Sequence, residues 1–136
     1  MGYTHVNVTV KNPAAPERAW EGEFLVDTGA HDTFVPRRRL EAIGIEPLGS
    51  SLYELADGSI VEREVSGGLL EVMGRFGNCN VVFADDDTAP LLGVIALESL
   101  GAEVDPINER LRLIPARLAL SPRRVAQPKR AADNNG

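Results

Sequence analysis

A short apolar run, Phe24-Leu25-Val26, ends abruptly in Asp27-Thr28-Gly29, and this triplet occurs once among the 136 residues. The order predicts a strand that turns sharply into a glycine loop and carries a carboxylate at the turn. Ionised carboxylates avoid burial unless they are paired or functional. Because one such triplet can arise by chance, its meaning depends on the rest of the chain.

Glycine and proline are frequent, at 13 and 9 residues, whereas only 5% of the residues are aromatic. This balance favours an all-β chain of short strands and turns over a helical bundle. The length and the 43% apolar content suit one globular domain with a sizeable core. Cys79 is the single cysteine, so no intrachain disulfide can form, and we expect it to act as a small buried hydrophobe.

The net charge of -6 is unevenly distributed along the chain. Residues 117–136 hold five basic and one acidic residue, and we expect a basic, disordered tail after a domain spanning residues 1–116. The domain itself is strongly acidic, which argues against nucleic acid as a partner. No apolar run approaches the roughly 18 residues that span a membrane, and the N-terminus lacks the pattern of a secretory signal. These features predict a cytoplasmic protein without a membrane partner.

Hydrophobic alternation predicts several strands and one C-terminal helix. We expect strands over residues 3–11, 20–26, 69–76 and 79–84, a hairpin over 51–65, a short helical turn over 37–44 and a helix that ends at Gly101.

Two of the expected turns can be placed on specific residues. Asp57-Gly58 is the pair that a two-residue hairpin turn prefers, and folding there would set Ala56 opposite Ser59 and Leu55 opposite Ile60. The strand pair that follows would be joined through Gly77-Asn78.

Asp85-Asp86-Asp87 suggests a metal site and hence a metal-dependent hydrolase. However, adjacent residues of a strand point to alternating faces, and no other ligand residues recur nearby. We therefore interpret the run as a solvated loop and expect no metal and no other cofactor.

Three elements, in this order, carry a resemblance to a known family. They are Leu25-Val26-Asp27-Thr28-Gly29-Ala30-His31-Asp32-Thr33, the hairpin Leu55-Ala56-Asp57-Gly58-Ser59, and Leu91-Leu92-Gly93 leading into a helix. Residues 3–116 thereby resemble the retropepsin-like (retroviral-type) aspartic proteases, specifically their short bacterial single-domain relatives. The resemblance implies a mainly β closed barrel with one short C-terminal helix, which forms one half of a two-fold dimer.

The resemblance also implies roles for individual residues. Asp27, Thr28 and Gly29 would be catalytic, with the Thr28 hydroxyl bonding across to the partner loop. The hairpin would close over the substrate as a flap. The implied substrate-binding residues are Ala30, His31, Asp32, Ala56, Asp57, Gly58 and Ser59.

The expected chemistry requires two carboxylates. Carboxylates about 3 Å apart share one proton, so one activates water while the other donates to the peptide carbonyl. The chain has one Asp-Thr-Gly, and Asp57 lies in a polar hairpin that cannot replace a second one. We therefore predict a homodimeric aspartic endopeptidase acting on peptide or protein substrates, with Asp27 facing its symmetry mate. The alternative is a catalytically silent dimeric peptide-binding module on the same fold.

Departures from the viral pattern are informative. His31 stands where the viral enzymes carry an aspartate, and Val94 stands where they carry the arginine that pairs with it, so the dimer contacts must differ. His31 is either a solvent-facing loop residue or a subsite or pH-sensitive contact. Ala30 lacks the hydroxyl that pepsin-type enzymes direct at the carboxylate. We therefore expect the pair to keep its shared proton to higher pH, with a pH optimum nearer neutral.

Overall fold

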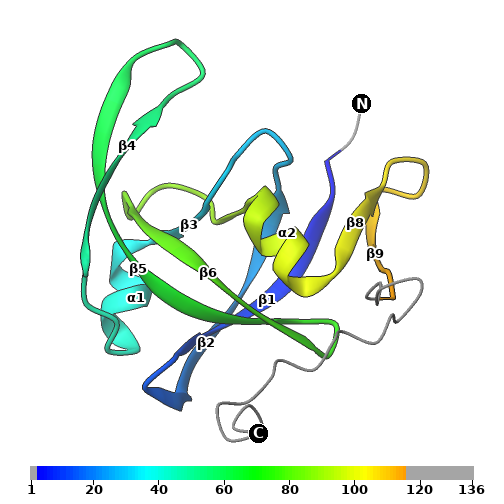
Figure 1. The fold of residues 1–136 in the computed structure, drawn as a ribbon, viewed down its shortest axis with the longest axis horizontal. Helices are drawn as coiled ribbons and strands as arrows, with labels where there is room; N and C mark the ends of the chain where they lie inside the picture. Colours follow the sequence, from blue (N-terminus) through cyan, green and yellow to red (C-terminus); the bar gives the residue numbers. More distant parts are fainter. Residues whose placement is uncertain (1–2, 116–136) are drawn as a thin grey trace, which may run out of the picture.

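The structure, a computed structural model, describes residues 3–115. In this range the chain forms nine strands and two short helices, shown in Figure 1: β1 His5–Asn12, β2 Ala15–Val26, β3 Thr33–Pro36, α1 Arg37–Ala42, β4 Gly49–Glu54, β5 Ile60–Val72, β6 Arg75–Ala84, β7 Leu91–Leu92, α2 Val94–Leu100, β8 Ala102–Asp105 and β9 Arg110–Leu113. The predicted tail, residues 117–136, lies outside the described residues.

Seven strands form one sheet in the order β1-β2-β7-β3-β6-β5-β4. Strand β1 also pairs with β5, so six of these strands close into a barrel, as the resemblance implied. In the part of the chain that the structure describes, β4 pairs only with β5, and the hairpin that they form projects away from the barrel (Figure 1). Strands β8 and β9 make a separate two-stranded sheet beside α2. The prediction of a mainly β closed barrel is confirmed.

The barrel interior is filled by alternating side chains of its strands and by the apolar faces of both helices. Fully buried members of this core include Val8, Val10, Phe24, Val35, Leu40, Leu70, Val81 and Leu92. Cys79 packs against this core, and burial raises the pKa of its thiol to about 11. A thiol that stays protonated at neutral pH is a poor nucleophile, which agrees with its expected structural role.

The β4–β5 hairpin forms as predicted, but its predicted register is wrong. Glu54 pairs with Ile60, and Leu55 N donates to Ser59 O at 2.8 Å, so the loop between Leu55 and Ser59 has three residues. Gly58 has a φ of 86°, whereas a two-residue turn would need Asp57 in the left-handed region as well. The Asp57 carboxylate instead accepts hydrogen bonds from the backbone and hydroxyl of Ser59, which lower the pKa of Asp57.

The predicted turn at Gly77-Asn78 is also wrong. The chain reverses at Met73-Gly74, where both residues have positive φ values of 53° and 83°. Gly77 and Asn78 lie inside β6. Gly77 is buried beneath α2, because a Cβ there would come within 2.7 Å of the Ser99 hydroxyl. This glycine allows close packing between a helix and a strand and has no part in a turn.

Both predicted helical segments are present. Helix α1 occupies the first part of the expected turn over 37–44, and α2 ends at Gly101, whose φ of 66° is typical of a helix C-cap. Neither helix in the described range is long and apolar enough to cross a membrane.

Candidate active site

Strand β7 places Asp27. Its two residues insert between β2 and β3. They pair in parallel with Leu25 and Val26 on one side, and Leu91 pairs antiparallel with Phe34 on the other. Asp27 N then donates to Leu92 O at 2.9 Å, so the chain leaves the sheet directly after Asp27. The apolar run before Asp27 is therefore a barrel strand, and Asp27 lies where the hydrogen bonding between β2 and β7 ends.

The loop after Asp27 folds back on itself. Gly29 N donates to Asp27 Oδ1 at 2.9 Å, and Ala30 N donates to the Asp27 carbonyl at 3.1 Å. The first hydrogen bond fixes one carboxylate oxygen. Ala30 has no hydroxyl and so cannot donate a side-chain hydrogen bond to the Asp27 carboxylate.

Helix α2 holds this loop from behind. The amides of Val94 and Ile95 donate to the carbonyls of Ala30 and His31 at 2.8 and 3.2 Å. Gly93 N donates to the buried Thr33 hydroxyl at 3.1 Å. Two segments that the sequence singled out separately, the Asp27 loop and Leu91-Leu92-Gly93, therefore form one hydrogen-bonded unit.

An open groove of about 1110 Å³ lies between this loop and the β4–β5 hairpin. Six of the predicted site residues line it, namely Asp27, Gly29, Ala30, His31, Asp32 and Ala56. Asp27 is half-buried at the groove. The structure does not bring four others into its lining: Thr28 is exposed outside it, and Asp57, Gly58 and Ser59 are exposed at the hairpin tip.

Tyr53, in β4, is a groove residue that sequence reasoning missed. Its hydroxyl donates to Asp32 Oδ2 at 2.7 Å, and its ring meets Phe34 edge-on with the centroids 5.5 Å apart. Burial, followed by the hydrogen bond to Asp32, raises the pKa of Tyr53 to about 12. The phenol therefore remains a donor across the physiological range. No sequence signal links these residues, because strand curvature brings them together.

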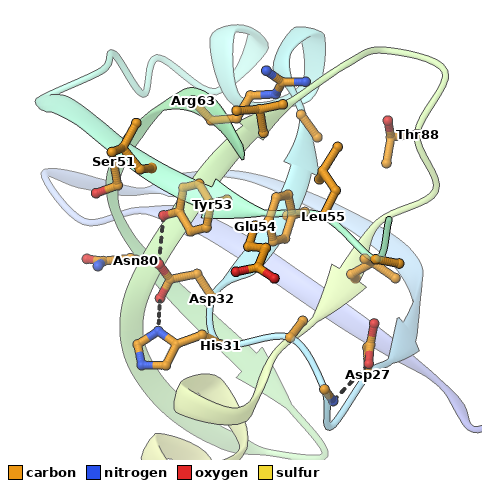
Figure 2. Close-up of a pocket in the computed structure, with 18 of the residues that line it drawn as sticks. Asp27, His31, Asp32, Ser51, Tyr53, Glu54, Leu55, Arg63, Asn80 and Thr88 are labelled. Carbon is orange, nitrogen blue, oxygen red and sulfur yellow. Dashed lines mark hydrogen bonds and ion pairs between the residues drawn. The ribbon is translucent and has the colours of Figure 1, made fainter. Parts of the chain in front are cut away.

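His31 and Asp32 differ sharply in exposure. The His31 side chain is 76% exposed, whereas that of Asp32 is 7% exposed. His31 Nδ1 lies 3.4 Å from Asp32 Oδ1, close enough for ion pairing, yet Oδ1 has no aligned hydrogen-bond partner among the described residues. Figure 2 shows the Asp32 carboxylate directed at Tyr53 and His31 rather than at Asp27. His31 thus faces solvent and also contacts a buried carboxylate.

The groove also holds Arg63, which sequence reasoning missed, and Asp85 of the acidic run, which was interpreted as part of a solvated loop. Arg63 of β5 lies 3.8 Å from Asp85, and both line the groove. Asp86 points elsewhere, because its carboxylate accepts a hydrogen bond from the backbone of Arg38 at 2.8 Å. Neighbouring carboxylates of the acidic run therefore have different partners.

One family model and several solved structures are similar to this chain. A family model described as aspartyl protease matches residues 6–102. The solution structure of the simian foamy virus (mac) protease matches with a TM-score of 0.51 and 20% identity, covering 70% of this chain and 92% of that one. A foamy viral protease-reverse transcriptase, solved in complex with an RNA/DNA hybrid, matches with a TM-score of 0.50 and 17% identity, covering 68% of this chain and 11% of that one.

A search among curated protein sequences found no match. The two structural matches show a shared fold. The family match spans the Asp27 loop, the β4–β5 hairpin and Leu91-Leu92-Gly93, the three elements on which the sequence resemblance depended. The chain belongs to the aspartyl protease family, as a retropepsin-like member.

Proposed function

We propose that this protein is an aspartic endopeptidase that acts as a homodimer, with the two Asp27 carboxylates facing each other across the dimer axis. The observation that carries the proposal is the placement of Asp27. Its carboxylate stands at the end of a barrel strand, is fixed by Gly29 N, and faces an open groove large enough for an extended peptide. Peptide hydrolysis by this chemistry needs two such groups, and each chain has one.

The proposed mechanism uses the shared proton of the pair. The ionised Asp27 takes a proton from a water held between the two carboxylates, and the protonated one donates to the carbonyl oxygen of the peptide bond. Gly29 N holds one Asp27 oxygen so that the other can face the water. The loop needs little rearrangement during the reaction, since helix α2 already fixes its backbone.

The groove is suited to an extended peptide with apolar side chains. Phe34, Leu52, Leu55 and Leu91 contribute to its walls. In this proposal the β4–β5 hairpin, residues 49–65, is the flap. Leu55 and Ala56 already line the groove, and Leu52 and Leu55 are exposed, so closing the flap over a peptide would bury apolar surface.

The direct test replaces Asp27 with Asn, which keeps the shape of the side chain but removes its charge. Purified wild type, Asp27→Asn and a control, Asp87→Asn, are incubated with a library of extended peptides, and the products are identified by mass spectrometry. Asp87 is an exposed loop carboxylate outside the groove lining. We expect cleavage by wild type and Asp87→Asn, inhibition of both by a statine peptide, and none by Asp27→Asn. Persistent cleavage by pure Asp27→Asn refutes the proposal, and peptide binding without cleavage by wild type favours the silent module.

A further inference from the structure

Strand β4 is weakly attached to the rest of the molecule. Within the described residues it is an outer strand that pairs only with β5, and five of its six residues are exposed. Tyr53 is the one that is partly buried. Because a strand with one neighbour and little buried surface opens easily, the contacts of Tyr53 have a large share in fixing its position.

Those contacts reach the segment that follows Asp27. The Tyr53 hydroxyl donates to Asp32 Oδ2 at 2.7 Å, and its ring packs edge-on against Phe34. Within residues 3–115, this is the only side-chain hydrogen bond between the flap and the loop of residues 27–32. Figure 2 shows the dashed line that joins the Tyr53 hydroxyl to the Asp32 carboxylate.

Asp32 is a firm anchor for this bond. Its backbone carbonyl packs against Gly93 at the start of α2, and the neighbouring Thr33 hydroxyl accepts a hydrogen bond from Gly93 N. Its side chain is 7% exposed, and Tyr53 supplies its one aligned hydrogen bond among the described residues. Removing the only donor from a buried carboxylate is costly, which favours the closed contact.

We propose that Tyr53 is a positioning residue: its hydroxyl ties flap strand β4 to the loop that carries Asp27, and so sets the height of the flap above the groove. The kinetic consequence rests on the proposed function, because it concerns peptide cleavage. The structural consequence does not, since it can be measured on the protein without substrate.

The decisive variant is Tyr53→Phe, which keeps the ring against Phe34 and removes only the hydroxyl. Tyr3→Phe is the matched control, because Tyr3 is the other tyrosine of the chain and is 73% exposed. Hydrogen exchange is followed by mass spectrometry on both variants and on wild type. We expect exchange of the β4 amides and of residues 60–65 to rise about ten-fold in Tyr53→Phe. Exchange in β1 and β2 should stay within about two-fold of wild type, and Tyr3→Phe should match wild type throughout.

Peptide kinetics give the second readout. If the tether keeps the flap in its binding position, its loss reduces the fraction of competent protein, and KM rises in inverse proportion to that fraction. The kcat value should stay within about two-fold, because Tyr53 has no role in the chemistry. A wild type that cleaves no peptide refutes the proposed function, while the exchange experiment still decides whether the tether exists.

Two results overturn the inference. One is unchanged β4 exchange in folded Tyr53→Phe, and the other is equal acceleration along the barrel strands, which indicates a general loss of stability. Should Tyr53→Phe not fold, Asp32→Ala and Asp32→Asn replace it. Asp32→Ala removes the acceptor and should accelerate β4 exchange, whereas Asp32→Asn keeps an acceptor oxygen and should not. If the β4 amides of Asp32→Ala exchange as slowly as those of wild type, the inference is overturned.

Discussion

Gly93 and Asp32 approach each other more closely than any side chain would permit. A Cβ on residue 93 would lie 2.4 Å from the Asp32 carbonyl oxygen and 2.9 Å from that of His31. The absence of a side chain allows the first turn of α2 to hydrogen-bond the loop after Asp27. The glycine that follows Leu91-Leu92 therefore supports the groove from behind.

Gly93→Ala should separate α2 from this loop. Because the clash is with backbone atoms, we expect a loss of about 1–3 kcal/mol in the free energy of unfolding and a large fall in peptidase activity. Gly67→Ala is the matched control, since a Cβ there meets nothing within 4 Å. Urea unfolding compares the two variants. Equal stability of both would contradict the role assigned to the Gly93 contact.

Mixing wild type with Asp27→Asn tests whether two chains share one active site. If they do, each mixed dimer lacks one of the two carboxylates, and the activity of wild type should fall as inactive chains are added. With a five-fold excess of Asp27→Asn and random exchange, only about one wild-type chain in six keeps an intact partner. Activity is compared with wild type diluted equally in an unrelated protein. Full activity in the presence of excess Asp27→Asn, at concentrations where exchange is demonstrated, would argue against a shared site.

The three segments on which the family prediction depended are present in the structure, because each is encoded by a local sequence pattern. An apolar strand before Asp27, a hairpin with Asp57-Gly58 and a glycine before a helix all depend on short-range backbone preferences. The Tyr53–Asp32 contact joins residues 21 positions apart, and no local pattern encodes it. It arises from the sheet order and the curvature of the hairpin.

The predicted turn at Gly77-Asn78 is wrong because Gly77 has a different structural role. Gly77-Asn78 has the composition of a turn, but Gly77 is needed because α2 packs against it. The actual turn uses Met73 at positive φ, which is uncommon for a residue with a side chain. A pattern based on residue preference cannot distinguish a glycine needed for conformation from one needed for space.

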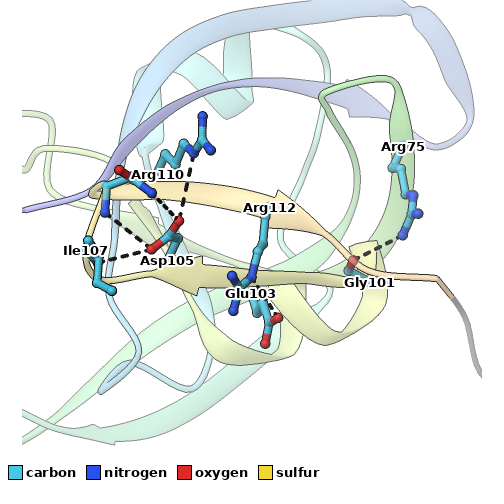
Figure 3. A network of polar contacts seen from close by, with 8 residues as sticks. Arg75, Gly101, Glu103, Asp105, Ile107, Arg110 and Arg112 are labelled. Atoms are coloured by element: carbon cyan, nitrogen blue, oxygen red, sulfur yellow. Dashed lines mark hydrogen bonds and ion pairs between the residues drawn. The ribbon is translucent and has the colours of Figure 1, made fainter.

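Arg75 should stabilise the fold by attaching the last described residues to β6 and α2. Its guanidinium donates to the carbonyls of Leu100, Gly101 and Ile114, and so joins β6, the end of α2 and the residue after β9; Figure 3 shows the bond to Gly101. We expect Arg75→Met to lower the free energy of unfolding by about 1–2 kcal/mol. Arg112→Met removes an exposed ion pair with Glu103 and should cost less than about 1 kcal/mol. A larger effect at Arg112 than at Arg75 would contradict this ranking.

Alkaline pH should reveal the environment of Tyr53. Its pKa is raised to about 12 in the folded chain from an ordinary value of 10, so the folded state keeps a proton that the unfolded state loses first. The resulting stabilisation is fully present below pH 10 and is lost as the pH rises to about 12. Between pH 10 and 12, Tyr53→Phe should therefore lose less stability than wild type. The Cys79 thiol, whose pKa is also raised, is present in both proteins and does not affect the comparison. Parallel stability profiles of the two proteins above pH 10 would show that Tyr53 is not perturbed.

Ala30 should determine the acidic limb of the activity profile. Residue 30 lies on the groove next to the Gly29 amide that binds the Asp27 carboxylate, and alanine supplies no hydroxyl to stabilise the ionised form. Ala30→Ser adds such a donor at little cost in volume, and hydrogen bonding to a carboxylate favours its charged state. We expect wild type to have a pH optimum nearer neutral than that of pepsin-type enzymes, and Ala30→Ser to shift the acidic limb of kcat/KM to lower pH. An optimum of wild type well below pH 4, or a shift of the acidic limb of Ala30→Ser to higher pH, would refute this role for residue 30.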